Sequence, residues 1–400
     1  MISERIHAII AETETKDEIW AKLPIIWEKR MVAMITKFSV KNFKNFKEKI
    51  TWDLSQPCSY EFNSEAIEND CVAKGIIYGP NGSGKTNLGL AVFDIVLHLT
   101  DKNKLRSYTP YVNMDSKIDN ATFEYTFIFD GIEVMYKYSK IYEDELFYEV
   151  LHIDGKEVLS YDFIENTGYT TLQGAETLNM LSYENPISRV KFIKSNAILE
   201  DNKINNTFYQ FVNFVDKMLM FYSLDTRGYQ GFKLGRKSIT EGIIESGSVK
   251  DFENFLHEQD IHYELVVKEI DGEKRLFCKF ENGEASFWGV ASTGTRSLAI
   301  FYYWYIEMKS ASFIYIDEFD AFYHFELAEH IIRKLKEIKG CQIFLSTHNT
   351  DLMTNDLLRP DCYFLINDNK IKTVSSSTEK ELRKAHNLQK MYKAGAFNNE

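Results

Sequence analysis

The chain has 400 residues, and 47 Lys and Arg against 59 Asp and Glu give it a formal net charge of −12 at pH 7. This length suggests about two or three domains, while 44% hydrophobic residues and only 6 prolines exclude disordered, collagen-like and low-complexity classes. The acidic excess disfavours binding of nucleic acid over the whole surface, although a local basic groove would not be visible in the net charge.

The cysteines are scattered and predict neither a metal site nor a disulfide framework. No C-x-x-C pair occurs, and no His stands near a Cys at metal-ligand spacing. No apolar run reaches the roughly eighteen residues of a membrane helix, and the first residues do not resemble a signal peptide. We therefore expect reduced thiols in a cytoplasmic protein without a membrane partner. The cysteines are Cys58, Cys71, Cys278, Cys341 and Cys362.

Residues 1–33 form an N-terminal extension of uncertain role. Ile6, Ile9 and Leu23 fall loosely at helical spacing, and a strand pattern begins at Met34. A docking helix and a non-essential extension with Met34 as the functional start are equally compatible with this pattern.

Strand and helix patterns follow in order. Two strands are expected within residues 35–54, and a third, residues 75–78, runs into a glycine-rich turn that leads to a helix at residues 87–100. Residues 122–153 alternate as an antiparallel meander with a hairpin turn at Asp130-Gly131.

The pattern becomes helical over residues 176–260, with glycine breaks at Gly228, Gly231 and Gly235. Beyond it, an Asp271-Gly272 turn joins the first two expected strands, and the following helices and strands alternate, which indicates parallel pairing. The expected strands are 262–267, 276–280, 313–316 and 342–345, and the expected helices are 295–308 and 326–338.

The glycine-rich turn fits the pattern G-x-x-x-x-G-K-[ST] of a phosphate-binding loop, and it lies between a strand and a helix as that loop requires. Its backbone N–H groups and the helix N-terminus can bind phosphate oxygens. Lys85 would reach the β and γ phosphates, and the Thr86 hydroxyl would ligate Mg²⁺. The loop residues are Gly79, Pro80, Asn81, Gly82, Ser83, Gly84, Lys85 and Thr86.

An apolar strand, residues 313–316, delivers Asp317 and Glu318 at its carboxyl end, where ligands gather in open α/β sheets. Asp317 would bind Mg²⁺ and Glu318 would polarise the attacking water. At the end of the next strand, His348 can donate a hydrogen bond to the γ phosphate and sense its presence.

These spacings resemble the ABC-type ATPases, in particular the soluble branch that includes RecF, SMC proteins and the OLD family. The segment Ser292-Thr-Gly-Thr-Arg-Ser297 resembles the signature motif of that branch. The resemblance implies that Ser292 and Gly294 close over the γ phosphate bound to a partner subunit, that Asp320 occupies the D-loop, and that the first strands, from Phe38, cover the adenine.

Residues 317–325 and the tail 382–395 resemble the small AAA-type, ABC-like ATPases of bacterial antiphage and abortive-infection systems. Two features depart from the wider family. No Gln occurs between Thr86 and residue 153, so the Q-loop role is unfilled or falls to a residue such as Asn113. Long heptad arms are absent, which excludes a chromosome-tethering rod.

Only 52 residues follow His348 (400 − 348), too few for the nuclease domain of OLD proteins. A nuclease or toxin acting with this chain is therefore expected on a separate chain. Five basic residues in the tail could contact nucleic acid, but a solvated helix face is the favoured interpretation. They are Lys380, Arg383, Lys384, Lys390 and Lys393.

Together the motifs predict an α/β P-loop NTPase with an ABC-type head, built from an antiparallel β lobe and a parallel α/β core. Residues 34–175 and 261–400 would form the head, and residues 176–260 an inserted helical lobe. We expect an ATP- and Mg²⁺-dependent ATPase that acts as a homodimer or higher homo-oligomer and controls an effector in antiphage defence. The alternative is a RecF- or SMC-like DNA-maintenance ATPase that clamps DNA.

Overall fold

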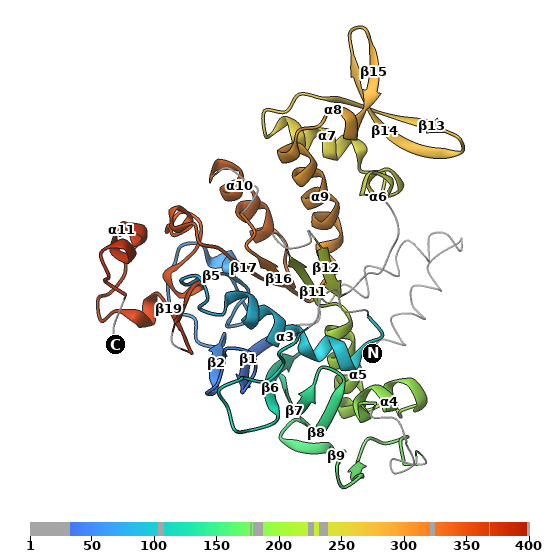
Figure 1. The fold of residues 1–400 in the computed structure, drawn as a ribbon, viewed down its shortest axis with the longest axis vertical. Helices are drawn as coiled ribbons and strands as arrows, with labels where there is room; N and C mark the ends of the chain where they lie inside the picture. The colour runs from blue at the N-terminus through green and yellow to red at the C-terminus, as the bar shows by residue number, and fades with distance from the viewer. Residues whose placement is uncertain are drawn as a thin grey trace, which may run out of the picture. The chain divides into compact units, whose positions relative to one another are not determined.

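Two seven-stranded β-sheets enclose the helix α3 (Lys85–Leu99), which follows the phosphate-binding loop (Figure 1). The computed structural model describes residues 33–102, 108–176, 178, 187–222, 228–231, 239–320, 325–367 and 369–397. Residues 1–32 of the N-terminal extension, predicted over 1–33 as a docking helix or a non-essential segment, and the glycine break at Gly235 lie outside these residues. In this part of the chain, no helix has the length and apolarity to cross a bilayer.

The first sheet is antiparallel and confirms the predicted meander. Its strands alternate between buried and partly exposed positions, as in β6, because one face packs on the core. The Asp130-Gly131 turn has positive φ at both residues, 49° and 84°, which fits a two-residue hairpin. In sheet order the strands are β10 (Thr167–Thr170), β9 (Lys156–Asp162), β8 (Glu145–Ile153), β7 (Ile132–Tyr142), β6 (Ala121–Phe129), β1 (Ala33–Lys41) and β2 (Ile50–Asp53).

The second sheet has a parallel centre, as the late alternation of strands and helices predicted. Three of its strands, β5, β16 and β17, are buried at every position, which suits strands covered on both faces. In sheet order the strands are β12 (Gly228–Gly231), β11 (Leu219–Tyr222), β16 (Phe313–Asp317), β17 (Gln342–Ser346), β5 (Lys74–Tyr78), β18 (Tyr363–Asn367) and β19 (Lys370–Thr373).

A glutamine side chain ties the two sheets together. Gln342, at the start of β17, has no exposed surface. Its Oε1 accepts from the Ile35 N–H at 2.7 Å, and its Nε2 donates to the Ile35 carbonyl at 3.0 Å and to the Val72 carbonyl at 3.1 Å. The amide thus satisfies both backbone groups of one residue of β1.

The remaining helices cover the sheets. α5 packs its aromatic residues on the antiparallel sheet, where Phe211 and Phe214 contact Phe127. The helices and turns outside the small sheet are α4 (Arg189–Asn196), α5 (Lys203–Asp216), α10 (Phe325–Lys336), α11 (Leu388–Lys393), η1 (Ser64–Ala66), η2 (Thr350–Leu352), η3 (Pro360–Cys362) and η4 (Ser375–Ser377), with a short ladder of β3 (Ile67–Glu68) and β4 (Cys71–Val72).

A third, small sheet lies with several helices at one end of α9 (Figure 1). Phe252 of α7 packs against Phe287 of α8 and Tyr302 of α9, so aromatic contacts hold this group together. Its elements are β13 (Glu264–Ile270), β14 (Glu273–Phe280), β15 (Gly283–Ser286), α6 (Ile239–Glu245), α7 (Val249–His257), α8 (Phe287–Val290) and α9 (Thr293–Met308).

The stretch predicted as an inserted helical lobe, residues 176–260, contributes to more than one part of this architecture. It supplies α4 to α7, but it also supplies β11, which pairs with β16 inside the parallel sheet. The residues described between 33 and 397 form one compact unit. The predicted lobe boundaries therefore remain a prediction.

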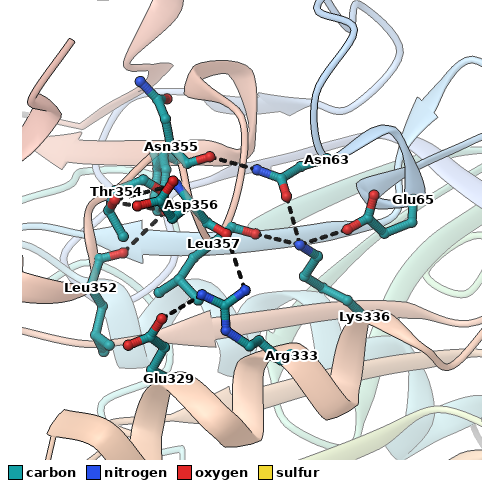
Figure 2. Close-up of polar contacts among 11 residues, drawn as sticks. Asn63, Glu65, Glu329, Arg333, Lys336, Leu352, Thr354, Asn355, Asp356 and Leu357 are labelled. Atoms are coloured by element: carbon teal, nitrogen blue, oxygen red, sulfur yellow. Dashed lines mark hydrogen bonds and ion pairs between the residues drawn. The ribbon is translucent and has the colours of Figure 1, made fainter. Parts of the chain in front are cut away.

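Lys336 at the end of α10 fastens the segment around η1 to the chain that follows β17 (Figure 2). Its Nζ donates to Asn63 Oδ1 at 2.8 Å and to the Leu357 carbonyl at 2.7 Å, and it lies 2.6 Å from Glu65 Oε1. Asn63 also donates to the Asn355 carbonyl at 2.8 Å. Because the Lys336 side chain is only 8% exposed, these partners satisfy a nearly buried ammonium.

Candidate functional site

The phosphate-binding loop connects β5 to α3 and needs glycine at several positions. A Cβ on Gly79 would lie 2.4 Å from Ser83 Oγ and 2.6 Å from the Ile366 carbonyl. Gly84 has φ of 103°, and a Cβ there would lie 2.6 Å from Asn45 Nδ2. The loop therefore keeps a shape that side chains on these residues would disrupt.

Lys85 extends back over this loop. Its Nζ donates to the Gly79 carbonyl at 2.8 Å and to the Pro80 carbonyl at 3.2 Å, and it lies 3.4 Å from His348 Nδ1. Burial lowers the pKa of Lys85, while the charges of Glu318 and Asp317 oppose this change. A cation thus lies inside the loop, where the motif places phosphate oxygens.

Asp317 meets Thr86 across the parallel sheet. The Thr86 hydroxyl donates to Asp317 Oδ2 at 2.7 Å, although the two residues are 231 apart in sequence. β17 lies between β16, which ends at Asp317, and β5, which leads through the loop to Thr86. The carboxyl ends of the parallel strands meet at one edge, as the predicted magnesium site required.

Glu318 and His348 lie beside this contact. Glu318 adopts the left-handed backbone region with φ of 45°, and His348 Nε2 lies 3.7 Å from Glu318 Oε1. The side chains are 26% and 42% exposed, so a small molecule can approach both. Since His348 Nδ1 also faces Lys85, the imidazole lies between the loop lysine and the glutamate.

The signature residues do not join this cluster within one chain. Ser292 is the N-cap of α9, and its Oγ accepts from the Thr295 N–H at 3.1 Å. The N-terminal end of α9 lies beside α8, at the opposite end of the helix from the parallel sheet (Figure 1). Ser292 and Gly294 thus lie apart from the loop of their own chain, and their binding role stays a prediction.

Two further predicted residues have structural contacts. Asp320 accepts a hydrogen bond from Thr347 Oγ1 at 2.6 Å, which joins the predicted D-loop to the residue before His348. Asn113 donates to the Lys44 carbonyl at 2.6 Å and accepts from the Asp115 N–H at 3.0 Å. Its amide shapes a loop in this structure, so it lends no support to a Q-loop role.

The sequence reasoning missed two residues that organise the cluster. Tyr315, in the middle of β16, donates to the Lys85 carbonyl at 2.6 Å, and its ring fills the space left by Gly89. Ser346, at the end of β17, donates to Asp317 Oδ1 at 2.6 Å and accepts from the Glu318 N–H at 2.8 Å. The only signal for Ser346 was its place two residues before His348.

The residues present fit a nucleotide with a divalent cation. Thr86 and Asp317 supply hard oxygen ligands, and Mg²⁺ commonly takes one or two protein ligands together with phosphates and water. Among the described residues, no group of three or more His, Cys, Asp or Glu that could hold a metal ion forms. The buried Ser83 Oγ has no hydrogen-bond partner within the described part of the loop, so it can accept or donate to a ligand there.

Part of the chain matches a known protein family. Residues 248–354 match the family model described as "AAA domain, putative AbiEii toxin, Type IV TA system". The matched segment runs from the N-cap of α7 to two residues beyond η2, and it contains the predicted signature, both carboxylates and His348. No curated protein matches the chain.

Solved structures of SMC heads are similar to the chain. The SMC head domain from Thermotoga maritima has 15% identity and a TM-score of 0.44, and covers 85% of this chain and 98% of its own. An SMC head bound to the C-terminal winged-helix domain of ScpA has 16% identity, a TM-score of 0.42, and coverages of 85% and 97%. An SMC head with an extended coiled coil, bound to the C-terminal domain of ScpA derived from Pyrococcus furiosus, has 15% identity, a TM-score of 0.43, and coverages of 85% and 95%.

The site and the matched segment together indicate the class of protein. A phosphate-binding loop with a carboxylate pair at the same sheet edge indicates a P-loop ATPase of the ABC type. Within that class, residues 248–354 of the chain are similar to the AAA-domain family model.

Proposed function

We propose that this ATPase binds ATP through the loop at residues 79–86, with Thr86 and Asp317 holding Mg²⁺ and Glu318 acting as the base. The observation that carries this assignment is the 2.7 Å contact between the Thr86 hydroxyl and Asp317 Oδ2. Both residues are of types that ligate Mg²⁺, and although they are distant in sequence, they lie in contact at the edge of the sheet beside Lys85.

The roles of the side chains follow from their chemistry. Lys85 exchanges its hydrogen bonds to the loop carbonyls for bonds to the β and γ phosphate oxygens. Glu318 accepts a proton from the attacking water at its carboxylate, and His348, 3.7 Å away, donates to the γ phosphate. Mg²⁺, when bound, neutralises negative charge on the phosphate oxygens.

We further propose that two copies of the chain close around ATP. The position of Ser292 and Gly294 at the far end of α9 supports this, because these residues need a second copy to reach a phosphate. ATP would then favour the closed pair and hydrolysis would release it, which makes the nucleotide a switch on contacts with other proteins.

The biological setting we propose is antiphage defence with a separate effector chain. The description of the matched family, which names AbiEii and a Type IV toxin–antitoxin system, supports this setting. The alternative is a DNA clamp, for which the exposed tail offers basic side chains such as Arg383 and Lys393, 72% and 58% exposed. The net charge of −12 favours a protein partner.

The substitution Glu318→Gln tests the proposal. It should leave ATP affinity unchanged, slow hydrolysis by roughly 10²–10⁴-fold, and accumulate a dimer with ATP and Mg²⁺ in light scattering. The double variant with Lys85→Ala is the control and should stay in the state seen without nucleotide. A Glu318→Gln protein that remains monomeric with ATP and Mg²⁺ would contradict the dimer switch, and one that hydrolyses ATP at the normal rate would contradict the base assignment.

A further inference from the structure

The hydroxyl of Ser346 lies at the centre of the carboxylate pair. Ser346 ends β17 and has no exposed surface. Its Oγ donates to Asp317 Oδ1 at 2.6 Å and accepts from the backbone N–H of Glu318 at 2.8 Å. One small side chain therefore contacts both acidic residues of the proposed site.

The first of these bonds fixes the rotation of the Asp317 carboxylate. Oδ1 accepts from Ser346, and Oδ2 accepts from Thr86 at 2.7 Å. Because each carboxylate oxygen accepts a hydrogen bond from a different hydroxyl, the orientation of the carboxylate plane is fixed. Without Ser346, the carboxylate can rotate about its Cβ–Cγ bond, and Oδ2 no longer faces Thr86 in a fixed direction.

The second bond supports an uncommon backbone conformation. Glu318 has φ of 45°, a region that residues with a side chain rarely adopt and that persists only where the surroundings hold it. The N–H of Glu318 points to Ser346 Oγ, and the N–H of Phe319 donates to the Ser346 carbonyl at 3.1 Å. Ser346 thus holds two successive peptide groups, and with them the direction in which the Glu318 side chain leaves the strand.

We propose that Ser346 is a positioning residue for the ATPase reaction: it orients the Asp317 carboxylate toward the metal and holds Glu318 in its working direction. This inference rests on the proposed roles of Asp317 and Glu318. It does not extend to Thr347, whose hydroxyl binds Asp320 instead.

The test compares Ser346→Ala with Ser346→Thr and a matched control. Ser312→Ala removes another buried hydroxyl, one that donates to the Phe214 carbonyl at the opposite end of β16. The measurements are the Mg²⁺ dependence of binding of a fluorescent methylanthraniloyl ATP, the steady-state constants for ATP hydrolysis, and the melting temperature without nucleotide.

Ser346→Ala should raise the Mg²⁺ concentration for half-maximal binding and lower kcat, each by roughly 10–100-fold, because groups that orient a metal ligand have effects of this size. KM for ATP at saturating Mg²⁺ should change by less than about 3-fold, since the hydroxyl of Ser346 reaches the loop at residues 79–86 through Asp317. Ser346→Thr keeps the hydroxyl and should restore the Mg²⁺ dependence. Ser312→Ala should have the Mg²⁺ dependence and the kcat of the wild type.

Two results would overturn the inference. One is a Ser346→Ala protein with the wild-type Mg²⁺ dependence and kcat. The other is a variant whose melting temperature, KM and kcat all fall together and are not rescued by Ser346→Thr, because that pattern indicates a structural role alone. Failure of the proposed function is separate: it would show as wild-type protein whose binding of the fluorescent nucleotide persists unchanged in Lys85→Ala.

Discussion

Lys140 and Asp94 form an ion pair in the interior, with Nζ 2.7 Å from Oδ1 and neither side chain exposed. Lys140 lies on β7 and Asp94 on α3, so the pair joins the antiparallel sheet to the helix that begins at Lys85. Tyr138 and Tyr111 each donate to Asp94 at 2.9 Å. Burial raises the pKa of the Asp94 carboxyl, and Lys140 with the two tyrosines opposes this rise.

Removing one partner of this pair should be costly. Lys140→Met leaves a buried carboxylate without its cation, and should lower the free energy of unfolding by about 3–5 kcal/mol. The double variant with Asp94→Asn should recover part of this loss, because no charge then remains buried. Denaturant titration measures both variants. Strictly additive losses would show that the two charges do not depend on each other.

Loss of the loop lysine should weaken nucleotide binding. Lys85→Ala removes charge-assisted hydrogen bonds worth about 1.5–3 kcal/mol, so ATP affinity should fall by roughly 10–100-fold. Lys380→Ala, an exposed change in the tail, is the matched control and should bind normally. Fluorescence titration with an ATP analogue gives both affinities, and equal values would remove the basis for the loop assignment.

Alanine substitutions at Gly84 and Gly131 distinguish the cost of a strained backbone from the cost of a steric clash. Both have positive φ, 103° and 84°, but a Cβ on Gly131 meets nothing within 4 Å, whereas one on Gly84 approaches Asn45 and the Phe46 ring. Gly131→Ala should cost about 1–2 kcal/mol from the backbone alone. Gly84→Ala should cost more and should also weaken ATP binding. Thermal melts and binding titrations of the pair check this, and equal stability losses would show that the close approach is unimportant.

The contact between Glu65 and Lys336 should depend on pH. Burial raises the pKa of Glu65, but hydrogen bonding and the charge of Lys336 outweigh it, so the pKa lies below the ordinary value. The stabilisation is therefore present above the pKa of the unfolded chain and is lost as pH falls through the folded value.

For this pair, Glu65→Gln should lower the free energy of unfolding at pH 7 by less than about 1 kcal/mol, since the Glu65 side chain is 44% exposed. The difference from wild type should shrink as the pH is lowered toward the acid range. Unfolding titrations at several pH values test the sign, and a difference that grows in acid would contradict it.

The local motifs were predictable because their signals lie within short stretches. The strand, loop and helix around Lys85 and the carboxylates at the carboxyl end of β16 each follow from periodicity and spacing. Ser346 and Tyr315 were not predictable, because their roles depend on which strands become neighbours in the sheet. β11 was missed as a strand since its four residues, Leu219–Tyr222, lie within a largely helical stretch and show no alternation.

The side-chain amide of Gln342 makes the same pair of hydrogen bonds to Ile35 that a neighbouring β-strand would make, and it links β17 to β1, which belong to different sheets. Since it bonds both backbone groups of Ile35, the amide hydrogen of Ile35 can exchange with solvent only when β1 separates from β17. β17 ends at Ser346, two residues before His348. The hydrogen-exchange rate of the Ile35 amide therefore reports how often β1 separates from β17, and mass spectrometry can measure it without a label near the nucleotide.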